Sequence, residues 1–183
     1  MAASPVTGTT GKQRLEILDV VDTQNRIVGR ADRPLIHHLG LRHRAVHVLI
    51  FNRIGQVFVQ LRSLQKKSDP GLWDSSVSGH VDHGETCRQA VVREMQEEVG
   101  VTAVVCLQFV LPAQQTTGYE FSYVYQCFSD GPIILQQEEI SDGRWLLPGQ
   151  LTQELATTPC RFSSSLQLIW EYWLGRQSIS DGL

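Results

Sequence analysis

The sequence has few cysteines, no basic excess and no long apolar segment, and each absence excludes a class of protein. Its four cysteines lie far apart and form no Cys-x-x-Cys pair, which argues against a structural zinc site or a disulfide framework. The net charge of -3 and the pI near 6.0 argue against a polyanion-binding protein, so we expect no nucleic-acid partner. The longest apolar runs are far shorter than the roughly 20 residues that span a bilayer.

These absences leave a cytoplasmic globular protein with reduced thiols and no membrane partner as the expectation. A chain of 183 residues with a hydrophobic fraction of 42% can bury a core without help from disulfides. Residues 1–12 are rich in Ser, Thr and Gly and lack the apolar stretch of a signal peptide. We therefore expect a flexible tail at residues 1–13 and a single domain at residues 14–183. The oligomeric state stays open, and a homodimer is one possibility.

Hydrophobic periodicity predicts a chain that begins with strands and ends with helices. A stretch at 150–183 has helical spacing, with Trp170 and Trp173 expected in the core. The expected strands lie at residues 15–21, 26–30, 45–51, 56–61, 75–81, 101–111, 119–128 and 143–147.

One helix is predicted with defined ends, at residues 87–99. Thr86 and Gln89 have the spacing of a capping box, in which each side chain binds a free backbone N–H of the first turn. Gly100 supplies the residue that commonly ends a helix. The helix is therefore predicted from its caps as well as from its apolar face.

The same helix carries Glu94, Glu97 and Glu98 on one arc that borders the apolar face. Like charges three and four residues apart repel, and acids in a last helical turn oppose the helix dipole. A solvated acidic face is the simplest interpretation of an arbitrary Glu pair. Several residues that destabilise the helix at one place instead indicate a function. A divalent cation bound by these carboxylates would replace their repulsion with shared coordination. Oxygen ligands of this kind suit Mg²⁺ or Mn²⁺ better than zinc.

The spacing of these acids is similar to the signature of the Nudix hydrolase family. That signature is Gly, five residues, Glu, seven residues, Arg-Glu, an apolar residue, any residue, Glu-Glu, any residue, Gly and an apolar residue. Its fixed residues, at frequencies of about 5–7% each, would coincide by chance on the order of once in a million chains. The matching residues are Gly79, Glu85, Arg93, Glu94, Met95, Glu97, Glu98, Gly100 and Val101.

The resemblance implies an α/β fold in which an α/β/α sandwich surrounds a mixed sheet, and a magnesium- or manganese-dependent enzyme. It makes Glu97 and Glu98 the principal metal ligands and Arg93 an orienting partner. The general base stays open among Glu94, which we favour weakly, Glu98 and a downstream acid: Glu120, Glu138 or Glu139. The implied metal ligands are Gly79, Glu85, Glu94, Glu97, Glu98 and Glu120.

A longer stretch, concentrated in residues 41–45, 60–67 and 70–80, resembles the branch of the family that contains type 1 isopentenyl-diphosphate isomerase. By that resemblance Arg62 and Lys66 contact the substrate diphosphate. Its metal-site residues would be His43, His80, Glu120 and His37.

The chain departs from the isomerase pattern in three places. Ser78 stands where the isomerase has its catalytic Cys, and a hydroxyl is a far poorer proton donor and acceptor than a thiol. The Arg93-Glu94 pair is intact, as hydrolysis requires, whereas isomerases lose it. Gly118 replaces a further acidic ligand, so the sequence leaves open whether the histidines form a second metal site.

The sequence therefore predicts hydrolysis of a diphosphate linkage in a nucleoside diphosphate joined to another group. Isopentenyl-diphosphate isomerase activity is one alternative, and a Nudix ligand sensor without catalysis is another. The complete set of acids argues against the sensor, and Ser78 argues against the isomerase.

Overall fold

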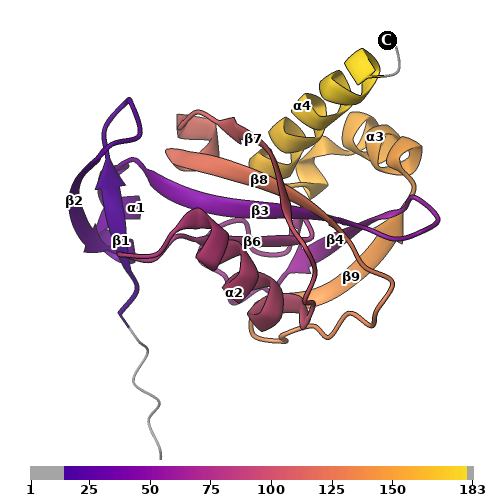
Figure 1. The fold of residues 1–183 in the computed structure, drawn as a ribbon, viewed down its shortest axis with the longest axis horizontal. Coiled ribbons are helices and arrows are strands. Elements are labelled where there is room, and N and C mark those ends of the chain that lie inside the picture. The colour runs from indigo at the N-terminus through magenta and orange to yellow at the C-terminus, as the bar shows by residue number, and fades with distance from the viewer. Residues whose placement is uncertain (1–14, 181–183) are drawn as a thin grey trace, which may run out of the picture.

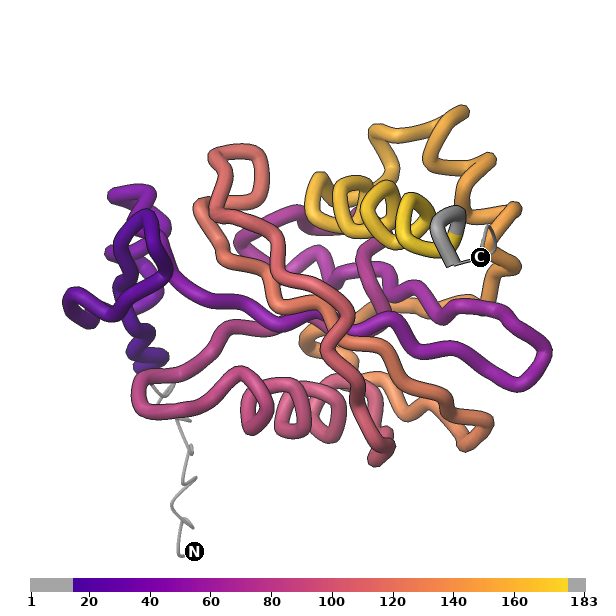
Figure 2. The backbone as a smooth tube through the Cα atoms, turned by 45° about the horizontal axis from the view of Figure 1, so that its top comes forward, coloured from indigo at the N-terminus to yellow at the C-terminus, as the bar shows by residue number. Residues whose placement is uncertain are grey.

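The computed structural model describes residues 15–180, so the tail expected at residues 1–13 lies outside the described residues. A central sheet is covered by one helix on one face and by two helices on the other (Figure 1). A small hairpin and a short helix lie at one end of this sandwich, as the turned view also shows (Figure 2). No helix among the described residues is long and apolar enough to cross a membrane.

The described part of the chain begins with strands and ends with helices, as expected, and two further helices lie between strands. The helices are α1 (Arg33–Leu39), α2 (Cys87–Val99), α3 (Pro148–Thr157) and α4 (Ser164–Ser180), with short 3-10 turns at Gln115–Thr117 and Pro159–Arg161. The strands are β1 (Ile17–Val21), β2 (Ile27–Asp32), β3 (His43–Phe51), β4 (Val57–Arg62), β5 (Trp73–Asp74), β6 (Val77–His80), β7 (Cys106–Leu111), β8 (Glu120–Phe128) and β9 (Ile140–Leu146).

The sheet is mixed and centred on β3. This strand runs parallel to β8 over its whole length and antiparallel to β6, and β7 adds to the outer side of β8. It meets β4 only at the hairpin end, where Phe51 lies opposite Val57. Away from this pair, β6 accompanies β3 while β5 and β9 accompany β4. The sheet thus separates into two parts, one with β3, β6, β7 and β8 and the other with β4, β5 and β9, and the two parts diverge from the hairpin end.

The two faces of β3 belong to two different cores, because successive side chains of a strand point to opposite faces. Val46 and Ile50 pack in the cluster that contains Met95 of α2. Leu49 packs in the cluster that contains Trp170 of α4. The tryptophans of α4 are therefore core residues, as expected. The α/β/α order predicted from the sequence is confirmed.

Helix α2 has the predicted ends. The Thr86 hydroxyl accepts a hydrogen bond from the Gln89 backbone N–H at 3.2 Å, and the Gln89 side chain accepts one from the Thr86 N–H at 2.9 Å. Gly100 ends the helix in the left-handed conformation, at φ 65°. The local chemistry of the caps therefore fixes the helix to within a residue.

Two expectations differ from the structure. The strand predicted at residues 101–111 begins only at Cys106, because residues 101–105 bury Val101 and Val105 in the α2 core without pairing to a strand. Helix α1 was not expected at all. Its first turn is capped by the Asp32 side chain, which accepts a hydrogen bond from Leu35 N–H at 2.8 Å.

The capping box gives a stability prediction. Replacing Thr86 by Ala removes the acceptor for the Gln89 N–H, and we expect the free energy of unfolding to fall by about 1 kcal/mol. Thr102→Ala is the matched control, because that exposed hydroxyl bonds only the Gln96 side chain; its effect should stay within about 0.5 kcal/mol. Equal effects of the two variants in urea unfolding would contradict the capping role.

Candidate active site

A cavity of about 660 Å³ opens where β3 and β4 separate. Its walls come from both parts of the divided sheet, from α2 and from the N-terminal unit. Three of the predicted site residues, Glu85, His43 and Glu138, do not line it. Those that do are Arg62, Lys66, Gly79, Arg93, Glu94, Glu97, Glu98 and Glu120, together with His37, His80 and Glu139.

Glu98 is the most buried of the α2 carboxylates, with 3% of its surface exposed. It accepts hydrogen bonds from the Ser78 backbone N–H at 3.1 Å and from the Gln60 side chain at 3.2 Å. Burial raises its pKa to about 8, and the neighbouring Glu94 carboxylate adds to the increase. Without a cation nearby, this carboxyl group resists ionisation at neutral pH.

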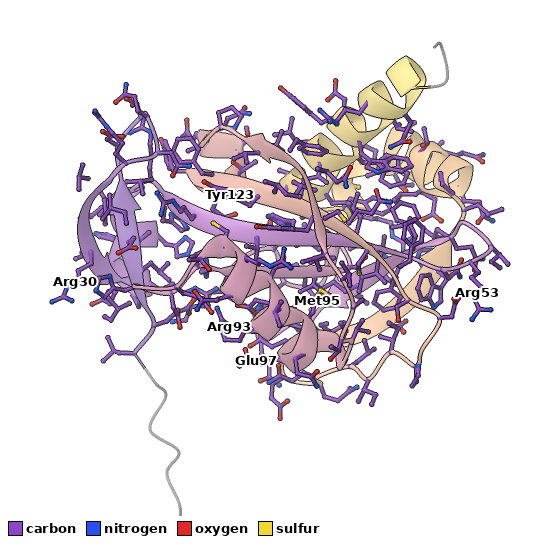
Figure 3. The ribbon with its side chains drawn as sticks, in the orientation of Figure 1. Arg30, Arg53, Arg93, Met95, Glu97 and Tyr123 are labelled. Atoms are coloured by element: carbon purple, nitrogen blue, oxygen red, sulfur yellow. The ribbon has the colours of Figure 1, made fainter. Side chains whose placement is uncertain are left out.

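Glu94 and Glu97 extend the acidic set from Glu98 toward solvent. Burial raises the pKa of Glu94 to about 7, although the Arg93 guanidinium opposes the increase. Gly79 leaves room for Glu94, because a Cβ atom there would overlap the carboxyl carbon. Glu97 is more exposed and lies on the same side of α2 as Arg93 (Figure 3). The carboxylates therefore form a graded row from the protein interior to the cavity mouth.

Arg93 holds this acidic set together. Its guanidinium donates to Glu94 at 2.7 Å and to Glu97 at 3.2 Å. The same group donates to both oxygens of Glu85, at 3.0 and 2.8 Å, and to the His80 carbonyl at 3.1 Å. The geometry agrees with an orienting role for Arg93. Glu85 acts here as the partner that fixes Arg93, and its role as a metal ligand stays a prediction.

The two predicted diphosphate contacts line the cavity but are engaged with the protein. Arg62 is buried and donates to Asp74 and Ser78, both at 3.2 Å, and to the Ser68 carbonyl. The Lys66 ammonium pairs with Glu139. Arg62 therefore stabilises the wall of the cavity in this structure, and a direct contact with diphosphate stays a prediction for both cations.

Three imidazoles from separate elements meet at the other end of the cavity. His37 comes from α1, His43 from β3 and His80 from β6. Each pair of ring centroids is 5.2 Å apart, and one ligand atom from each ring lies within 4.8 Å of the others. Burial and the two neighbouring rings lower the pKa of His37 to about 4, which favours the neutral form that binds metals.

His43 presents an unpartnered nitrogen to this cluster. Its Nδ1 lies 2.9 Å from the Leu41 carbonyl, which can only accept, so Nδ1 carries the proton. Nε2 is buried, has no hydrogen-bond partner and faces Glu120 Oε1 at 3.7 Å. In the neutral ring the Nε2 lone pair thus points at a carboxylate.

His47, four residues after His43 on β3, shows the same pattern. The Ser75 hydroxyl donates to the Val77 carbonyl, so it accepts from His47 Nδ1 at 3.0 Å. Nε2 of His47 has no partner and lies 3.9 Å from Glu120 Oε2. No sequence feature distinguished His47, because its position depends on Ser75 and Glu120 from other elements.

The two ends of the cavity therefore fit cations of different chemistry. The α2 end offers carboxylates and the Gly79 loop, which suit Mg²⁺ or Mn²⁺. The imidazole end offers the orphaned Nε2 atoms of His37, His43 and His47 beside the Glu120 carboxylate. Separations of 3.5 to 3.9 Å between the ring nitrogens and Glu120 are too long for hydrogen bonds and suit a cation between them.

Comparisons with known proteins agree with this geometry. The family model described as the NUDIX domain matches residues 41–164. The chain is 33% identical over 149 residues to an uncharacterized Nudix hydrolase of Pseudomonas aeruginosa, covering 79% of this chain and 86% of that protein. It is 31% identical over 154 residues to the isopentenyl-diphosphate Delta-isomerase of Serratia proteamaculans, covering 81% and 86%. The crystal structure of DR0079 from Deinococcus radiodurans superposes with a TM-score of 0.77 at 30% identity, covering 86% and 98%.

The burial of Glu98 predicts a pH-dependent stability. Its pKa is raised from 4.5 to about 8 in the folded protein, so between these values the folded state keeps a proton that the unfolded state releases. The free energy of unfolding of the metal-free protein should therefore fall as pH rises through this window. Denaturant titrations in a chelating buffer at several pH values measure the slope. Glu98→Gln should make it shallower, and an unchanged slope in that variant would contradict the assignment.

Gly79 gives a second prediction. In Gly79→Ala the new methyl group overlaps the Glu94 carboxyl group, so the flexible acid must leave its place beside the loop. We expect a folded protein that binds Mn²⁺ at least about tenfold more weakly in calorimetry. Gly149→Ala is the control, because a Cβ atom there meets no atom within 4 Å. Equal Mn²⁺ affinity in both variants would show that the Gly79 cradle is unimportant.

Proposed function

The chain belongs to the Nudix hydrolase family, whose members hydrolyse phosphoanhydride bonds, and we propose that its substrate is a nucleoside diphosphate linked to a second group. The bond broken is the diphosphate linkage, with Mg²⁺ or Mn²⁺ as the cation. The observation that carries this proposal is the meeting of Glu94, Glu97 and Glu98 with two cationic side chains, Arg62 and Lys66, in one cavity.

The residues of α2 fit the cation that this reaction needs. Gly79, Glu94, Glu97 and Glu98 would hold it, and Glu120 lines the same cavity. When bound, a divalent cation neutralises the diphosphate and makes a water molecule a better nucleophile. The raised pKa values of Glu94 and Glu98 support this assignment, because a nearby cation would favour the ionised form of both.

Side chains of the protein would bind the diphosphate and accept the proton of the attacking water. Lys66 pairs with Glu139 and also lowers the pKa of the buried Glu98 through its charge, so a diphosphate that enters competes with carboxylates for the same ammonium group. Glu94 is our choice for the general base, because it lines the cavity and a bound cation would keep its carboxyl group ionised and able to accept a proton. Glu139 is already paired with Lys66, which makes it a weaker candidate.

A second cation would occupy the imidazole end. We infer that His37, His43, His80 and Glu120 bind it, because the rings converge and the Nε2 atoms of His37 and His43 are buried without partners. Nitrogen-rich sites suit transition-metal ions such as Mn²⁺ or Zn²⁺ better than Mg²⁺. The acid missing at Gly118 would leave this site with one carboxylate fewer than the isomerases have.

Isomerase activity is the second candidate, favoured by the histidine cluster and by the similarity to the Serratia isomerase. Two observations favour hydrolysis. Ser78 is bound to Arg62 and Asp74 in place of a reactive thiol. Among the described residues that line the cavity, only Ala45 has an apolar side chain. A five-carbon chain would therefore find little apolar surface there.

The enzyme assay tests the proposal directly. Purified protein is incubated with Mg²⁺ and a panel of nucleoside diphosphate derivatives, together with the two isomeric five-carbon diphosphates, and products are identified by mass spectrometry. We expect hydrolysis at the diphosphate and a loss of about 100-fold or more in kcat/KM for Glu98→Gln and Glu97→Gln. Glu171→Gln, an exposed site on α4, is the control. A panel without metal-dependent products, together with unaffected variants, would reject the proposal; isomer formation would favour the second candidate.

A further inference from the structure

Part of the cavity wall comes from residues that precede the region matched by the family model. That region begins at residue 41, whereas Glu16, Arg33 and His37 also line the cavity. Arg33 and His37 belong to α1 and Glu16 directly precedes β1, so all three are part of the N-terminal unit formed with β2, which lies at one end of the sandwich (Figure 2). The site is therefore not complete within the family region alone.

Glu16 makes the most specific contact of this unit with the rest of the site. Its Oε1 lies 2.9 Å from Nδ1 of His80 on β6, and its Oε2 accepts a hydrogen bond from Arg33 at 2.9 Å. The Glu16 backbone carbonyl also accepts the Arg33 N–H at 2.9 Å. Glu16 thus joins the imidazole end of the cavity to the first residue of α1.

The two carboxylates beside His80 compete for its proton, and the distances decide which one receives it. Glu16 is 2.9 Å from Nδ1, within hydrogen-bond length, whereas Glu120 is 3.5 Å from Nε2. A carboxylate can only accept, so the neutral ring places its hydrogen on Nδ1. Nε2 then keeps its lone pair toward Glu120 and the other two imidazoles. A ligand histidine held through its second nitrogen by a carboxylate has this arrangement.

We propose that Glu16 is a positioning residue of the active site, which holds His80 as the Nδ1–H tautomer so that its Nε2 lone pair faces the cavity. This inference rests on the proposed function, because it gives His80 a role as a ligand. Through Arg33, Glu16 also secures the start of α1, the helix that carries His37. The N-terminal unit then belongs to the active site, because it supplies the imidazole of His37 and orients that of His80.

The tautomer can be observed without any substrate or metal. Two-bond proton–nitrogen correlation spectra distinguish a protonated from a bare ring nitrogen, and the His80 signal is assigned by its loss in His80→Gln. The two neighbouring carboxylates raise the pKa of His80 against the effect of burial, so spectra are recorded over an alkaline pH series and the tautomer is determined from the signals of the neutral ring. We expect the Nδ1–H form in the unaltered protein and a shift toward the Nε2–H form in Glu16→Ala.

Two variants separate this role from a general structural one. Glu154→Ala removes an ion pair with Arg144 whose side chains are 30% and 31% exposed, closely matching 31% and 29% for Glu16 and Arg33. It should lower the melting temperature as Glu16→Ala does and leave the His80 tautomer unchanged. Arg33→Ala should also keep the Nδ1–H form. If Glu16→Ala does not fold, Glu16→Leu retains most of the side-chain volume without an acceptor and should show the same shift.

Metal binding provides the second measurement. Calorimetric titration with Mn²⁺ alone is performed in a Glu98→Gln background, which weakens the α2 site, and we expect Glu16→Ala to lower the remaining affinity by about ten- to hundredfold. An unchanged His80 spectrum in Glu16→Ala, or a changed spectrum with unchanged Mn²⁺ affinity, would overturn the inference. Because the spectra need no turnover, they also separate this failure from a failure of the proposed hydrolysis.

Discussion

The carboxylates of α2 are the constraint on which the rest of the site depends. Glu98 is almost fully removed from water, and Glu94 lies beside it with a pKa near neutrality. Two like charges in such a place need donors or cations around them, since desolvation of an unpaired charge is strongly unfavourable. The surrounding residues meet this need in part, since the pKa of Glu98 stays raised to about 8. Ser78 and Gln60 donate to Glu98, Arg93 donates to Glu94, and the absent side chain of Gly79 leaves the space.

The division of the central sheet gives these acids a cavity to face. Because β3 pairs with β4 only near Phe51, its first half is free to carry polar residues on the face that α4 covers further along. His43 and His47 occupy that half and meet Glu120 from the parallel strand β8. One cavity therefore has an oxygen-rich end and a nitrogen-rich end, which explains how a hydrolase signature and isomerase-like histidines coexist in one chain.

Local features of the fold could be predicted because nearby residues determine them. The caps of α2 lie within a few residues of the helix, and its bounds were predicted correctly from Thr86, Gln89 and Gly100. The strand expected at residues 101–111 started too early, since apolar residues such as Val101 and Val105 suit a buried loop as well as a strand. Helix α1 escaped prediction because it has only 7 residues, which is too short for a clear helical period, and buries a single one, Ile36.

The sequence by itself determined the family, the spacing of the acids and their placement on one side of a helix, because a helix repeats at a fixed angle per residue. It also supplied the residues of the diphosphate and metal hypotheses, through resemblance. Only the tertiary structure decided their partners. It bound Arg62 to Asp74, bound Glu85 to Arg93, and brought Glu16 against His80, a residue 64 positions away. The physical reason is that a hydrogen bond depends on distance and direction in space, which no spacing along the chain encodes for residues from different elements.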